Sequence, residues 1–220
     1  MAIRIFENDP DARPKQRFTD DVVGRFRSGT LLNNRPLALD EWRVTSGDPE
    51  VVRTIQELLG GDDPQQWETQ SEEKYEVFTE AKSVNIVLDG PTALKTGMAL
   101  WGRNGLIHSC DGEVTTDGQP CPMAGKSVQE RKEAAKAGFG CEPSIQLYFR
   151  LEADPDLGKF KFFSGSWTLA AAVEAVETEL AAIDGPARAN LSLQVVEFDT
   201  KAGRHVRYTK PVVKVLGAAE

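Results

Sequence analysis

The sequence lacks the features on which secretion and membrane insertion depend. Its first residues, MAIRIFENDPDARP, place acids and prolines where a secretory signal needs an apolar run. No stretch of about 18 apolar residues occurs, and the most apolar segment, 169–183, is interrupted by Glu174, Glu177 and Glu179. We therefore expect a soluble, cytoplasmic protein that has no membrane partner.

Motifs typical of common enzyme classes are also missing. The sequence contains neither G-x-x-x-x-G-K-[ST] nor G-x-S-x-G, and the stretch 164–167 resembles a nucleophile elbow only superficially. Zinc-dependent base deaminases need H-x-E followed by P-C-x-x-C, but His108 is followed by Ser109 and Cys110. The sequence therefore predicts a binding protein with no catalytic residues and no small-molecule substrate, not an enzyme.

A strong positive charge is absent as well. The net charge is −8 and the sequence pI is about 5.0, whereas proteins that grip duplex DNA usually carry a basic patch. One local exception is the segment 201–210, which leaves open an alternative function as a DNA-binding accessory protein. Charge runs usually mark solvated surfaces, so the simpler interpretation is an exposed hairpin. The segment's cationic or titratable residues are Lys201, Arg204, His205, Arg207 and Lys210.

The residues that are present predict a folded α+β protein. After Asp48, a good N-cap, apolar residues recur at helical spacing up to Gly60-Gly61. A capping box begins at Ser127, and a long helix is expected over 167–183. Strands are expected at 3–6, 22–26, 75–77, 84–88, 98–101, 106–108, 145–151, 160–163, 191–198 and 206–215.

Strands and helices do not alternate regularly along the chain, which favours a largely antiparallel sheet. We expect one domain over residues 1–220, with two or three helices and a Cys/His-rich loop insert at about 105–145. Pro211 cannot donate to a sheet ladder, so the last strand should lie at an edge or carry a bulge.

That insert holds all 3 cysteines of the chain. Their odd number and the expected cytoplasmic setting disfavour a disulfide framework. Each cysteine has turn-forming neighbours, and turns can fold separate loops around one Zn²⁺. The spacing contains no C-x-x-C pair, so three free thiols and an unrelated histidine remain the alternative. The candidate ligands of a closed, structural Cys₃His site are His108, Cys110, Cys121 and Cys141.

Six strings, taken in order and spacing, resemble one family. This family is the recombination directionality factors of temperate phages of Streptomyces-type hosts, which are accessory proteins of large serine integrases. Related factors carry a cysteine-rich insert, often with a Cys-x-Cys pair. Gln119 stands two residues before Cys121, so the resemblance leaves His108 as the fourth ligand. The strings are IRIFENDPDARP, DVVGRFRSG, WRVTSGDPEV, ELLGGDDPQQWET, MALWGRNG and FSGSW.

The resemblance implies a function without bond cleavage. Such a factor binds the integrase itself, with the coiled-coil region as the expected target, and meets DNA only indirectly through it. It activates excision (attL × attR) and inhibits integration (attP × attB). The acidic net charge of the chain agrees with a protein partner. A DNA-binding role of segment 201–210, or an unrecognised metabolic role, remains the alternative.

Overall fold

The computed structural model describes residues 21–219 except 34, 70, 103 and 202. The strand expected at 3–6 lies outside the described residues. None of the described helices is long and apolar enough to span a bilayer.

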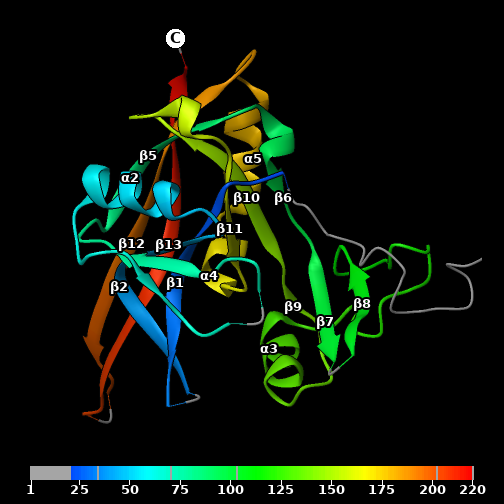
Figure 1. Ribbon diagram of the computed structural model, residues 1–220. Coiled ribbons are helices and arrows are strands. Elements are labelled where there is room, and N and C mark those ends of the chain that lie inside the picture. The colour runs from blue at the N-terminus through cyan, green and yellow to red at the C-terminus, as the bar shows by residue number, and fades with distance from the viewer. Residues whose placement is uncertain (1–20, 34, 70, 103, 202, 220) are drawn as a thin grey trace, which may run out of the picture.

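The fold is α+β and its main sheet is largely antiparallel, as the sequence predicts (Figure 1). The strand order is β13-β12-β5-β10-β11-β1-β2-β4-β3, β6 pairs with β10, and only β1 and β11 run parallel among the described pairs. The strands are β1 (Gly24–Leu32), β2 (Arg35–Ser46), β3 (Gln65–Gln66), β4 (Tyr75–Phe78), β5 (Ser83–Leu88), β6 (Leu94–Lys95), β10 (Ile145–Leu151), β11 (Phe160–Ser164), β12 (Ala187–Asp199) and β13 (His205–Ala218).

The sheet curls until distant members of its strand order meet. Asp40 of β2 accepts hydrogen bonds from Arg207 and Thr209 of β13, although five strands lie between β2 and β13 in the strand order. Among the described strands β13 pairs with β12 alone, so it is an edge strand, as Pro211 predicts.

Four α-helices occur among the described residues: α2 (Pro49–Leu59), α3 (Val128–Lys136), α4 (Trp167–Ala170) and α5 (Val173–Ala181). α2 begins at its Asp48 cap and α3 at the full capping box of Ser127, both as expected. The prediction of a single helix over 167–183 is wrong, because the segment forms two helices, α4 and α5. The amide of Ala172 bonds to the carbonyl of Leu169, three residues back, and this tighter turn separates α4 from α5.

The interior of the curled sheet holds the main core, where aromatic rings meet edge to face. Phe26 of β1 contacts Trp42 of β2 at 5.7 Å and Phe149 of β10 at 5.3 Å between ring centroids. α2 closes the core with Val52 and Ile55, which are fully buried. Apolar burial of this extent is the main stabilising contribution to the body of the fold.

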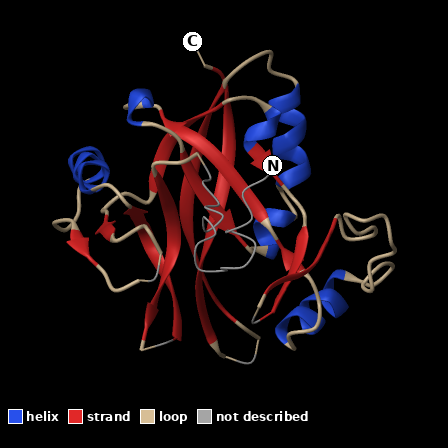
Figure 2. Cartoon of the chain, turned by 45° about the vertical axis from the view of Figure 1, so that its right-hand side comes forward, coloured by secondary structure: helices blue, strands red, loops and turns tan. Residues whose placement is uncertain are grey.

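A second, smaller sheet lies to one side of this body (Figures 1 and 2). Its strand order is β8-β7-β9, and α3 lies beside it in both views. We call β7 to β9, with α3 and the loops between them (98–143), the side module. Its strands are β7 (Met98–Gly102), β8 (Gly105–Cys110) and β9 (Glu142–Pro143).

Candidate metal centre

Three separate segments of the side module bring its histidine and cysteines together. His108 and Cys110 lie two residues apart on β8, so their side chains leave the strand on the same face. Cys121 follows the turn 115–120, and Cys141 comes directly before β9. The chain thus returns twice to the end of β8.

The four predicted ligand residues form one cluster. The three Sγ atoms and an imidazole nitrogen of His108 all lie within 4.8 Å of one another. Cys110 Sγ lies 3.5 Å from Cys121 Sγ and 4.0 Å from Cys141 Sγ, too far for a disulfide, and all three thiols are free. Tetrahedral coordination with Zn–S of about 2.3 Å places sulfur atoms about 3.8 Å apart, between these two separations.

The cysteines take the place of an apolar core in the side module. Each is about 96–97% buried, and together they form a buried cluster distinct from the main core. The side chains around them are Met98, Leu100, Met123 and Ala124. A module this small buries little apolar surface, so it needs another source of stability.

Without an ion, these thiols resist ionisation. Burial raises the pKa of Cys141 to about 12, and the neighbouring Cys110 sulfur adds to the effect. Burial, together with Cys121, also raises the pKa of Cys110. Thiolates packed this closely repel one another, and a bound cation is the usual means of stabilising them.

His108 contributes a further sign of an absent partner. Its Nε2 atom is buried and has no hydrogen-bond partner among the described residues. A buried ring nitrogen without a partner is costly unless it binds something that the structure does not include. The donor set of three thiols and one imidazole therefore fits a soft or borderline divalent metal ion.

Arg131 of α3 fixes the loops around the cluster. Its guanidinium donates to the carbonyl of Gly112 at 2.8 Å and to the Glu113 carboxylate at 2.8 Å. Its Nε also donates to the carbonyl of Lys126. This role of Arg131 was not predicted, because a charged helix residue is more often solvated.

The basic segment 201–210 is at the far end of the β12–β13 hairpin, and two of its five cationic or titratable residues contact acidic side chains. Arg207 donates to Glu197 and Asp40, and His205 lies 3.1 Å from Asp199. These contacts neutralise part of the segment, which weakens the alternative of a DNA-binding hairpin.

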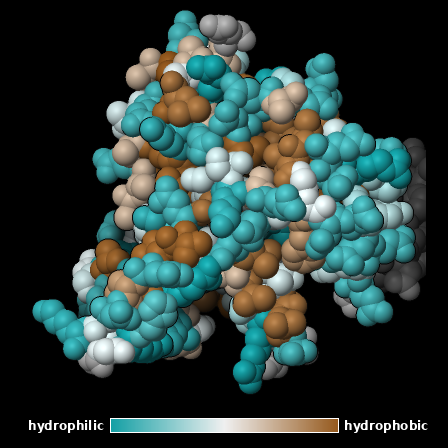
Figure 3. Space-filling model, turned by 90° about the vertical axis from the view of Figure 1, so that its left-hand side faces the viewer, coloured by the Kyte–Doolittle hydropathy of each residue, from teal (hydrophilic) through white to brown (hydrophobic). Residues whose placement is uncertain are grey.

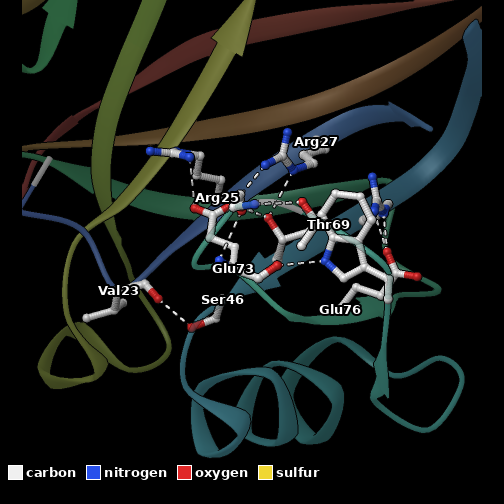
Figure 4. A network of polar contacts seen from close by, with 11 residues as sticks. Val23, Arg25, Arg27, Ser46, Thr69, Glu73 and Glu76 are labelled. Atoms are coloured by element: carbon white, nitrogen blue, oxygen red, sulfur yellow. Dashed lines mark hydrogen bonds and ion pairs between the residues drawn. The ribbon is translucent and has the colours of Figure 1, made fainter. Parts of the chain in front are cut away.

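A second polar cluster was not predicted from the sequence (Figure 4). On the outer face of β1, β2 and β4, Glu73 accepts hydrogen bonds from Arg27 and Thr45 and pairs with Arg25. Beside it, Arg43 Nε donates to Glu76 at 2.6 Å, with both residues buried. All its charges are matched internally, so this cluster stabilises the sheet and is not a candidate catalytic site.

A comparison with protein families assigns most of the chain to a known family. A family model described as Gp3-like, recombination directionality factor-like, matches residues 23–216. No solved structure matches the chain. The matched span includes both the main sheet and the side module.

Proposed function

The chain belongs to the Gp3-like family of recombination directionality factor-like proteins, and we propose that it is a phage recombination directionality factor that binds a large serine integrase in the bacterial cytoplasm. It activates excision (attL × attR) and inhibits integration (attP × attB). The observation that carries this proposal is the family match over residues 23–216.

The proposed action is a change of preference between two arrangements of the integrase. A binding protein can shift such an equilibrium only by the difference in its affinity for the two states. A difference of about 3–5 kcal/mol moves a two-state population most of the way from one state to the other. The factor therefore binds the arrangement that integrase adopts on attL and attR more tightly than the arrangement on attP and attB, with the coiled-coil region as its target.

Under this proposal the chain itself breaks no bond. The nucleophile belongs to the integrase, and the chain reaches DNA only through it. The acidic net charge of −8 supports this division, since a protein partner needs no basic DNA-binding face. The ion pairs of Arg207 with Glu197 and Asp40 support it further.

We also propose that His108, Cys110, Cys121 and Cys141 hold one structural Zn²⁺. Support comes from the close packing of the four ligand atoms and from the unpartnered Nε2 of His108. A Cys₃His set fills the tetrahedron, so it leaves no open position for a substrate or a catalytic water. When bound, the ion stabilises the thiolates and joins β8 to the two following loops.

The test is recombination in vitro with purified serine integrase and separate pairs of attachment sites. The full chain is titrated into the attL × attR reaction and into the attP × attB reaction. We expect activation of the first reaction and suppression of the second as the chain approaches the integrase concentration. The chain alone, incubated with each site, should leave the DNA uncut, and cleavage by the chain alone would contradict the proposal.

A further inference from the structure

The β12–β13 hairpin extends beyond the sheet that supports it. β5 pairs with β12 only from Ala187 to Ser192, whereas the pairing of β12 with β13 continues to Asp199 and His205. Residues 193–199 and 205–211 therefore form a two-stranded ribbon that projects from the body (Figures 1 and 2). An isolated two-stranded ribbon is only marginally stable by itself. The contacts of its side chains therefore show what stabilises it and which of its faces is left open.

The inner face of the ribbon, on the side of β2, holds all of its acidic residues. Glu197 and Arg207 lie directly opposite each other and are hydrogen-bonded. Arg207 also reaches Asp40 of β2, and Asp199 contacts His205 opposite. This face is therefore satisfied by contacts within the chain.

The outer face has a different composition. Because side chains alternate along a strand, the residues between these acids point outward. They form two apolar cross-strand pairs, Val196 with Tyr208 and Phe198 with Val206. Phe198 is 47% exposed and Tyr208 is 42% exposed. Both aromatic side chains are therefore open to solvent in the described part of the chain (Figure 3 shows apolar patches on the projections at the lower end of the molecule).

Cations, and no acids, flank these apolar pairs. The next outward pair of the ribbon is Gln194 with Lys210. The same face continues beyond the ribbon, where β12 also pairs with β5, through Ser192 with Val212 and Asn190 with Lys214. Neither lysine has an ion-pair partner within the described part of the chain. The chain as a whole has a net charge of −8, whereas the charged residues of this face are cations. Such a face is complementary to a partner that carries negative charge.

We propose that the outer face of the β12–β13 ribbon is the docking surface for the integrase, and that it binds a segment with an apolar stripe and acidic flanking residues. This inference rests on the proposed function and adds the surface to it. Val196, Phe198, Val206 and Tyr208 bury the stripe, while Lys210 and Lys214 pair with the acids. Duplex DNA fits less well, because its phosphates would meet four apolar side chains at the centre of the face.

The test measures binding of the full chain to full-length serine integrase, together with attL × attR recombination. One variant carries Phe198→Ser and Tyr208→Ser, and a second carries Lys210→Glu alone. Phe163→Ser on β11 is the matched control for the first, since Phe163 is 49% exposed on another strand. Lys74→Glu, at an exposed lysine, is the control for the second.

We expect both ribbon variants to bind integrase about tenfold more weakly or worse. Aromatic anchors carry much of the energy of an interface, and a glutamate at position 210 would repel the acidic residues of the partner. The two controls should bind as the wild type does, and thermal unfolding should show that every variant is folded. If the aromatic double variant does not fold, Lys210→Glu alone decides the matter, since its side chain is outside the core.

Ribbon variants that bind integrase as tightly as the wild type would overturn the inference, as would controls that lose binding equally. Salt-sensitive binding of the wild type to attachment-site DNA alone, lost in Lys210→Glu, would assign the face to DNA and also overturn it. If the wild-type chain fails to redirect recombination at all, the proposed function itself fails. An active wild type with unaffected ribbon variants refutes the docking surface alone.

Discussion

Cys110 Sγ and Cys121 Sγ lie 3.5 Å apart, although the two residues are eleven positions apart along the chain and a polar turn lies between them. The cluster they form with Cys141 is the only buried cluster of the side module among the described residues. A metal ion bound by these ligands would stabilise the side module, as the packed core around Phe26 and Trp42 stabilises the main sheet. The stability of the two parts should therefore respond to different changes.

The first prediction concerns metal content. Purified protein should contain about one zinc per chain by elemental analysis. His108→Ala should weaken zinc binding by more than the 10–100-fold that loss of a mere supporting residue costs, measured by competition with a chromogenic chelator. His205→Ala is the matched control, because His205 is the other histidine of the chain and lies exposed beside Asp199. A metal-free wild type, or equal loss in both variants, would contradict the zinc assignment.

The second prediction concerns removal of the ion. Chelation should speed backbone hydrogen exchange in β8 and in the loops that carry Cys121 and Cys141, since ligand closure supplies much of a small module's stability. Exchange in β10 and β11 should stay slow, because these strands belong to the main core. Exchange that is unchanged everywhere, or accelerated equally throughout the chain, would argue against a separate metal-dependent module.

The third prediction concerns the buried ion pair of Arg43 and Glu76. Glu76→Gln leaves the buried guanidinium without a counter-charge, so the free energy of unfolding should fall by about 3–5 kcal/mol. Urea denaturation measures the change. Glu50→Gln breaks an exposed pair with Arg53 and should cost about 1 kcal/mol or less. Similar costs for the two variants would show that burial does not govern these pairs.

The fourth prediction concerns pH. Hydrogen bonds from Arg207 and Thr209 hold the pKa of Asp40 below its usual range. A lowered folded-state pKa stabilises the fold above the unfolded value of about 4, and this contribution is lost as pH falls through the folded value. Asp40→Asn should therefore lower the melting temperature slightly at pH 7, with the difference from wild type vanishing in strong acid. A difference that grows on acidification would contradict this.

Local signals in the sequence predicted much of the fold. The Asp48 cap, the capping box at Ser127 and the alternation in β10 and β12 all act within a few residues, and the structure confirms them. β2 was missed because its outer half, from Arg35, is exposed and lacks alternation. Its strand conformation comes from pairing with β1 and β4, which no local pattern reveals.

In the candidate site, too, the features with a local sequence signal were predicted and those that depend on tertiary contacts were not. Turn residues around each cysteine indicated loops, and the structure confirms this for Cys121 and Cys141. Cys110 is instead the last residue of β8, so for this cysteine the loop prediction is wrong, although all three sulfur atoms meet. The contact of Arg131 with Gly112 and the pairing of Arg43 with Glu76 join residues 19 and 33 positions apart. Such contacts depend on tertiary geometry, so sequence spacing could not predict them.

The proposed switch in recombination direction is best tested by the recombination of attL with attR by a large serine integrase, with and without this chain. We expect little product from integrase alone, abundant product when the chain is added, and suppression of attP × attB recombination by the same amount of protein. Unchanged product yields in both reactions, with folded chain and active integrase, would contradict it.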